Sequence, residues 1–109
     1  MAIVLDANTH ANMVYFIYLM RFEFDRSKSA ANKVKHGIDF TEAQALWSDP
    51  DRLETPARTA DEPRFQIIGV IGDTLWSAFF TYRHEVIRII SVRHARVEEK
   101  RRYEAQDHD

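Results

Sequence analysis

The chain has no cysteine and only three glycines and three prolines among its 109 residues. Without thiols it forms neither disulfides nor thiolate zinc sites, which suits a reducing compartment. No apolar run approaches the roughly 20 residues that a membrane-spanning helix needs, and the run from Met13 to Met20 is far too short. We therefore expect a cytoplasmic protein that makes no membrane contact.

The charge of the chain is small overall but unevenly distributed. Its formal net charge is −2, which argues against a general nucleic-acid binder. Residues 83–103 hold seven basic and three acidic side chains, and residues 21–36 hold five basic and two acidic ones. Residues 49–62, by contrast, hold two basic and five acidic side chains. This segregation is compatible with a basic groove beside an acidic loop, and equally with ordinary scatter.

The first nineteen residues differ from the rest of the chain. A small polar segment precedes a short apolar run, without the basic segment or cleavage site of a secretory signal. We predict one domain over residues 20–106, which is enough for a core of its own. Residues 1–19 form an N-terminal extension that is either disordered or not part of that domain.

A strand and a helix are expected at the start of this domain. Phe22–Phe24 alternates with period two, as a strand does, and Asp25 then caps a helix. Gly37 suits the left-handed position that follows a helix. The narrow apolar stripe expected for this helix consists of Ala30, Ala31 and Val34.

A second helix start comes soon afterwards. Thr41–Gln44 has the form of a capping box, and Pro50 blocks continuation, so this helix is short. Residues 51–63 are polar and indicate a weak edge strand and a loop. Residues 95–106 are strongly helical by propensity, but they offer only a thin apolar face.

Between these helices lie the strongest strand signals. Arg64–Val70 is followed by Gly72-Asp73, which suits a tight hairpin turn. Leu75–Tyr82 and Val86–Val92 flank the polar break at His84-Glu85 and predict a second hairpin. The chain therefore indicates an α+β fold: an antiparallel sheet of three to five strands, two N-terminal helices and one C-terminal helix.

Three arginines, Arg83, Arg88 and Arg93, lie in this second hairpin. A charge near a core is costly unless it is paired or functional, so either each reaches solvent or a carboxylate, or the sheet presents a cationic floor to a phosphate. With a two-residue loop, Thr81 and Arg83 share a face with Arg88, whereas Ser91 shares the other face with Arg93. Only a bulge or a strand end would unite the arginines, and the sequence leaves the working face open.

RNA cleavage without a metal needs a base, an acid and cations around the phosphorus. Arg64 joins the hairpin arginines as a candidate cation, since a guanidinium matches two phosphate oxygens. His36, beside Lys35, has a pKa range suited to proton transfer, but it is equally a helix-terminal cation favoured by the dipole. The five histidines show no metal-ligand spacing, and we expect no metal or cofactor.

The last helix offers two further candidates on one face, Glu99 and Tyr103. Glu99 is either a base, weakened because nearby guanidiniums lower its pKa, or the ion-pair partner of an arginine. Tyr103 either stacks on a base or orients a phosphate, or else it is the hydrophobic anchor of its helix.

Several stretches, taken in order, resemble the BrnT toxins. The opening of the family is matched by Phe22–Asp25, Lys28, Asn32, Lys35–Gly37, Phe40 and Ala43. Its sheet is matched by Arg64-Phe65, Ile68-Gly69, Thr81, Ile87–Ser91, Arg93 and Ala95, and its closing pattern by Glu99-Lys100 and Tyr103. The resemblance covers most of the chain, about residues 20–104.

This resemblance implies a toxin of a type II toxin–antitoxin pair with a RelE-like ribonuclease fold. Such toxins cut RNA without a metal and stop translation. A cognate antitoxin, typically BrnA with a DNA-binding domain, sequesters the toxin and helps to repress the operon.

The same resemblance suggests the site residues. The catalytic set would be Arg64, Thr81, Arg83, Arg88, Ser91, Arg93, Glu99 and Tyr103. Lys35, His36 and Lys100 would contact RNA. Lys100 stands where the family has arginine, so the charge is kept but bidentate geometry is lost. Two alternatives remain: a module that binds RNA without cutting it, and a protein-interaction domain whose arginines meet an acidic partner.

Overall fold

The computed structural model describes residues 20–58 and 61–106, so the predicted extension over residues 1–19 lies outside the described residues. The described elements follow the order β1 (Phe22–Glu23), α2 (Arg26–His36), α3 (Phe40–Ala43), the 3-10 helix η1 (Gln44–Ser48), β2 (Leu53–Ala57), β3 (Arg64–Ile71), β4 (Thr74–Arg83), β5 (Val86–His94) and α4 (Val97–Glu104). This order confirms the α+β prediction, because helices both precede and follow the run of strands β2 to β5 along the chain.

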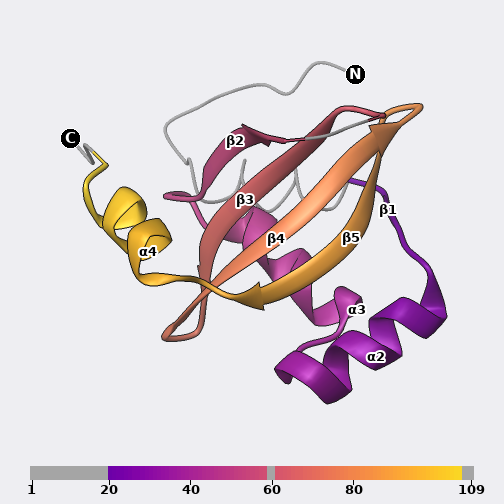
Figure 1. Cartoon of the computed structure of the whole chain (residues 1–109), viewed down its shortest axis with the longest axis horizontal. Helices are drawn as coiled ribbons and strands as arrows, with labels where there is room; N and C mark the ends of the chain where they lie inside the picture. The colour runs from indigo at the N-terminus through magenta and orange to yellow at the C-terminus, as the bar shows by residue number, and fades with distance from the viewer. Residues whose placement is uncertain (1–19, 59–60, 107–109) are drawn as a thin grey trace, which may run out of the picture.

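Within the described residues, five strands form one mixed sheet in the order β1-β5-β4-β3-β2 (Figure 1). Strands β2 to β5 pair antiparallel with one another, as predicted. Strand β1 instead lies parallel to β5, with Phe22 opposite Ile87 and Glu23 opposite Arg88. The direction of so short a strand depends on where the chain returns to the sheet, and local sequence does not encode that return.

Two-residue turns close both hairpins. Gly72 has a φ of 64°, which is the conformation expected of glycine at the first turn position. His84 and Glu85 also have positive φ, at 51° and 69°. Two consecutive left-handed residues match the twist of a tight hairpin, although side chains rarely adopt this conformation.

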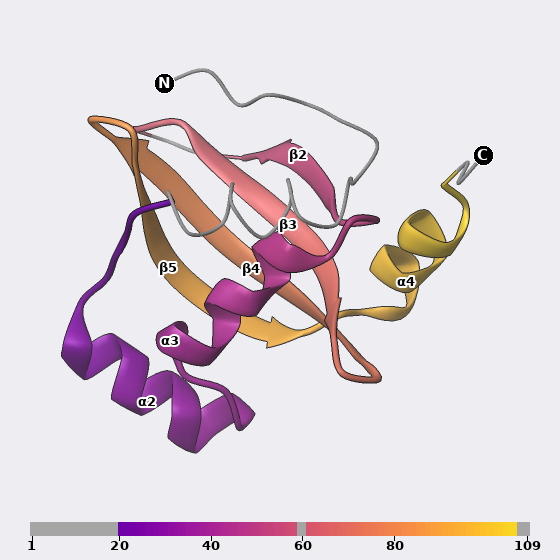
Figure 2. The same cartoon turned by 180° about the vertical axis from the view of Figure 1, so that it is seen from behind.

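The core lies between the sheet and the layer formed by α2, α3 and η1, which cover one face of the sheet (Figure 2). Trp47 of η1 is at its centre, with ring centroids 5.1 Å from both Phe22 and Phe80. The other buried members of the core are Ile38, Phe40, Ala43, Leu46, Ile67, Ala78, Ile87, Ile89 and Val92. This apolar layer packs on one face of the sheet, and none of its helices covers the opposite face.

Helix α2 begins and ends where the sequence predicts. The Asp25 carboxylate accepts a hydrogen bond from the Lys28 amide at 2.9 Å, and Gly37 has a φ of 83°. The residues that α2 buries, however, are Ser29 and Asn32. The predicted apolar stripe of Ala30, Ala31 and Val34 is wrong, because all three side chains are exposed.

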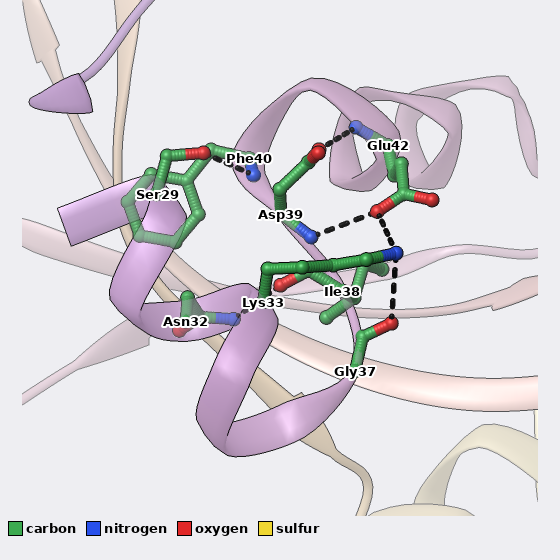
Figure 3. Close-up of polar contacts among 8 residues, drawn as sticks. All are labelled: Ser29, Asn32, Lys33, Gly37, Ile38, Asp39, Phe40 and Glu42. Carbon is green, nitrogen blue, oxygen red and sulfur yellow. Dashed lines mark hydrogen bonds and ion pairs between the residues drawn. The ribbon is translucent and has the colours of Figure 1, made fainter. Parts of the chain in front are cut away.

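Both buried polar residues of α2 are needed to satisfy backbone groups. Ser29 Oγ accepts a hydrogen bond from the Phe40 amide at 2.9 Å, so it serves the first turn of α3 (Figure 3). Asn32 donates to the Ile38 carbonyl and accepts from the Val92 amide of β5. A buried amide or carbonyl without a partner is costly, so these contacts override the apolar pattern of the helix.

The second helix, α3, starts earlier than the sequence predicts. Asp39, not Thr41, is its N-cap: the Asp39 carboxylate accepts from the Glu42 amide at 2.7 Å, and the Glu42 carboxylate accepts from the Asp39 amide at 3.0 Å. This start buries both Phe40 and Ala43 in the core. Two overlapping capping signals, at Asp39 and at Thr41, are present in the sequence, and tertiary packing favours the one at Asp39.

Candidate functional site

A β-bulge in β5 decides which side chains share the uncovered face. Phe79 lies opposite Ser91 but Phe80 lies opposite Ile89, so Ile90 is the extra residue of β5. One extra residue shifts the alternation of side chains along the rest of the strand.

The bulge places Arg88, Ser91 and Arg93 on one face of the sheet. Their partners on β4 are Thr81, Phe79 and Ser77 respectively. The separation of Arg93 from Arg88 that strict alternation predicts is therefore removed by the bulge. We call this the open face and define it by Arg64, Gln66, Ser77, Phe79, Thr81, Arg83, Arg88, Ser91 and Arg93. Among the helices of residues 20–58 and 61–106, only α4 borders it, at one end (Figure 1).

Arg64, Thr81 and Arg88 form a row across three adjacent strands. Thr81 lies opposite Arg88, while Arg64 and Thr81 both lie one residue beyond the β3–β4 pair of Phe65 and Phe80. The Thr81 hydroxyl donates to the Pro63 carbonyl at 2.6 Å, so it holds the start of β3 in place.

The Nε atom of Arg64 is buried without a hydrogen-bond partner among the described residues. A buried donor left unpaired is costly, and such exceptions in a native fold call for an explanation.

Arg83 and Arg88 have loosely held acidic neighbours. Arg88 lies 3.6 Å from the Glu23 carboxylate, and Arg83 lies 3.6 Å from the Glu62 carboxylate. The side chains of both pairs are partly exposed. Ion pairs of this kind contribute little net free energy, so either guanidinium can exchange its carboxylate for a phosphate.

Arg93 is held far more firmly, by Glu99. Its Nη1 and Nη2 atoms donate to the two Glu99 oxygens at 2.7 and 2.9 Å. The same carboxylate accepts from the Arg96 amide at 2.8 Å and from the Gln66 side chain at 2.6 Å. The Arg93 guanidinium also lies 5.3 Å from the centroid of the Phe79 ring. This network ties α4 to the sheet and fixes Arg93 in one orientation.

The network also sets the proton affinity of Glu99. Burial alone would raise its pKa, but the hydrogen bonds from Arg93, from the Arg96 amide and from Gln66 outweigh burial and hold the pKa at about 2. The ion pair is one of the two roles expected from the sequence. A carboxylate with this pKa is a weak base at neutral pH, and the contacts of Glu99 hold the Arg93 guanidinium in place.

Tyr103 anchors α4 at a different place. Its hydroxyl donates to Asp49 Oδ2 at 2.8 Å, and the same oxygen accepts from the Val70 amide. Burial and this hydrogen bond raise the pKa of Tyr103 above its usual value. Its hydroxyl is therefore directed to the edge of β3 and not to the arginines.

The remaining candidates are not gathered on the open face. Lys35 and His36 belong to the last turn of α2, in the layer behind the sheet (Figure 2). Lys100 is exposed on α4. Among the described histidines, His84 lies in the hairpin turn and His94 stacks on Trp76 at the end of β5, with ring centroids 4.1 Å apart.

Sequence reasoning missed two parts of this site. Gln66 and Phe79 hold the Glu99–Arg93 pair, yet neither was a candidate. Gln66 could have been found, because it lies two residues after Arg64 on a predicted strand and so shares its face. The contact of Phe79 with Arg93 depends on the bulge.

The fold and the open face together define a small α+β domain with arginines gathered on one side of its sheet. A family model described as "Ribonuclease toxin, BrnT, of type II toxin-antitoxin system" matches residues 24–99. The chain therefore belongs to the BrnT family, as the resemblance of its motifs indicated. No match was found among curated proteins.

Membership places the chain among ribonuclease toxins, whose target is RNA and whose partner is an antitoxin. Two further observations concern residues 20–58 and 61–106. They contain no helix long and apolar enough to cross a membrane. They also contain no group of three or more histidine, cysteine, aspartate or glutamate side chains that could hold a metal ion.

Proposed function

We propose that this protein is a metal-independent endoribonuclease that inhibits translation and is neutralised by a BrnA-like antitoxin. The bulge at Ile90 is the observation that carries the proposal. It aligns Arg88, Ser91 and Arg93 with the row that contains Arg64, on a face that the helix layer does not cover. Such a face suits the extended, anionic backbone of single-stranded RNA.

In this proposal the 2′-hydroxyl of RNA loses its proton to water as its oxygen attacks the adjacent phosphorus. The bond to the 5′-oxygen breaks, and this oxygen takes up a proton from water, which leaves a 2′,3′-cyclic phosphate and a 5′-hydroxyl end. Arg64 and Arg88 bind the phosphate oxygens and stabilise the charge that develops in the transition state. Arg83 and Lys100 attract the flanking phosphates. Glu99 acts indirectly, since it orients Arg93.

The arginines are tested by cleavage of single-stranded RNA in the presence of EDTA. We expect Arg88→Ala to lower the rate on the order of 100-fold or more, because a transition-state donor is lost. Arg26→Ala removes an exposed arginine of α2, in the layer behind the sheet, and is the matched control with an unchanged rate. Products should carry 5′-hydroxyl ends.

Two results would contradict the site. Unchanged cleavage by both Arg88→Ala and Arg64→Ala would remove the arginine row from the chemistry. Cleavage that stops in EDTA and returns with a divalent cation would contradict metal independence while leaving the RNA-binding face intact.

A second candidate function is RNA binding without cleavage. The hydrogen bonds that Glu99 accepts favour this candidate, because they hold its pKa at about 2 and make its carboxylate a poor proton acceptor. Salt-dependent binding of RNA with no cut product over long incubation would support this candidate over the nuclease.

A further inference from the structure

The outward face of α2 is more apolar than the face that it buries. Ser29 and Asn32 point toward the protein and serve backbone groups of neighbouring segments. Val34, on the opposite side of the helix, is 89% exposed. A surface helix normally buries its apolar stripe, so the outward face of α2 is a candidate contact surface.

Helical geometry arranges this outward face in three strips. At about 100° per residue, Ala30, Ala31 and Val34 lie together on the side away from Ser29 and Asn32. Basic residues border them on both flanks, Arg26 and Lys33 on one side and Lys28 and Lys35 on the other. Ser27 shares the central strip with Ala31 and Val34. All eight outward residues are exposed, and α2 contains no acidic residue.

A hollow lies along the Arg26 and Lys33 flank of α2, on the side toward α3. It has a volume of about 520 Å³ and is open to solvent. Its wall consists of Phe24, Ser29, Ala30, Thr41 and the charged residues Arg26, Lys33 and Asp39. Lys33 of α2 forms a 2.8 Å ion pair with Glu42 of α3 (Figure 3). The hollow is large enough to receive a bulky apolar side chain from a partner.

We propose that the outward face of α2, with this hollow, docks an amphipathic helix of the antitoxin whose apolar stripe is bordered by Asp and Glu residues. The inference rests on the proposed function in that it takes the antitoxin as the partner. Ala30 and Ala31 allow a helix to approach closely, and Val34 packs into its apolar stripe. Arg26, Lys28 and Lys35 pair with the acidic borders and set the orientation, while Lys33 is already paired with Glu42.

Charge and chemistry select this occupant over two others. A second copy of the chain would bring two sets of four cations together, and such like-charge contacts are unfavourable. RNA would pair with the cations, but it offers no apolar stripe to cover Val34. An acidic amphipathic helix satisfies both parts of the surface.

This docking surface lies in the helix layer, whereas the arginines lie on the other side of the sheet (Figures 1 and 2). Antitoxin affinity and RNA cleavage should therefore respond to different substitutions. A variant of Val34 should lose antitoxin affinity and keep its activity on RNA.

The test compares two exposed valines, Val34 of α2 and Val97 of α4, which are 89% and 66% exposed. Full-length Val34→Glu and Val97→Glu are titrated with the purified antitoxin that is expressed from the same operon. We expect Val34→Glu to weaken binding on the order of 10- to 100-fold, as loss of a central interface contact does. Val97→Glu should bind within about twofold of the parent, and both variants should cleave RNA at the parental rate.

Equal antitoxin affinity of the two variants would overturn the docking surface. So would a concentration-dependent dimer, in the absence of antitoxin, that Val34→Glu abolishes, because a second copy would then cover α2. If the parent protein cleaves no RNA while antitoxin binding still depends on Val34, the nuclease proposal fails and the docking surface stands.

Discussion

The two faces of the sheet are made from alternate residues of the same strands, yet they carry opposite chemistry. On one face Phe80 is 1% exposed and packs against Trp47. On the other face its neighbour Phe79 lies beneath the guanidinium of Arg93. Apolar burial thus concentrates on the helix-covered face, whereas cations gather on the open face. The difference teaches that stability and the proposed chemistry can be altered separately.

The first prediction sets these two phenylalanines against each other. Phe80→Ala should lower the free energy of unfolding by about 3–5 kcal/mol, because it leaves a cavity in a packed core. Phe79→Ala should cost about half of that or less, since its ring is partly exposed and loses mainly the contact with Arg93. Urea unfolding measures both. Equal costs would show that the open face contributes as much packing as the core.

The second prediction concerns the polar network of the open face. Glu99→Gln keeps the shape of the side chain but leaves Arg93 without its bidentate partner. We expect a loss of about 1–3 kcal/mol, less than for a fully buried pair because Arg93 is partly exposed. Urea unfolding at pH 7 gives the value, and an unchanged stability would mean that the network does not hold α4 to the sheet.

The same network predicts a pH dependence with a definite sign. The pKa of Glu99 is about 2 in the folded protein, below its ordinary value of 4.5. Its contribution to stability is therefore complete above pH 4.5 and is lost as the pH falls toward 2. The stability difference between the parent and Glu99→Gln should be largest at pH 7 and should shrink by pH 3. A difference that is constant over this range would contradict the lowered pKa.

The smallest effect is expected at Tyr103. Tyr103→Phe removes the hydrogen bond to Asp49 but keeps the ring, and Asp49 retains the Val70 amide. We expect a loss of about 0.5–1.5 kcal/mol in unfolding free energy and no change in the rate of RNA cleavage. A large loss of cleavage with normal stability would bring Tyr103 into the chemistry of the open face.

Local signals in the sequence predicted much of the fold. The Asp25 cap, the Gly37 stop and the turn at Gly72 depend on backbone conformations that particular residues favour, and all three are confirmed. The strands of both hairpins were also predicted, because runs of β-branched and aromatic residues mark them.

The features that shape the site depend on tertiary contacts. The bulge leaves one local trace, since the adjacent Ile89 and Ile90 interrupt the period of two between Arg88 and Ser91. This trace does not say which residue is the extra one. The burial of the polar face of α2 leaves no local trace in the sequence, because Asn32 is buried to satisfy an amide that lies 60 residues away in the chain. Sequence patterns therefore pointed to the arginines as candidate site residues, but they did not predict that the bulge places these arginines on one face of the sheet.

The most direct test of the central claim is to map RNA binding by NMR. Single-stranded RNA with 2′-O-methyl groups cannot supply the attacking hydroxyl, so the bound state persists without cleavage. The account predicts that amide shifts concentrate at Arg64, Thr81, Arg88 and Ser91, and that Val34 on α2 is unaffected. Shifts that concentrate on α2 and leave the open face unchanged would contradict it.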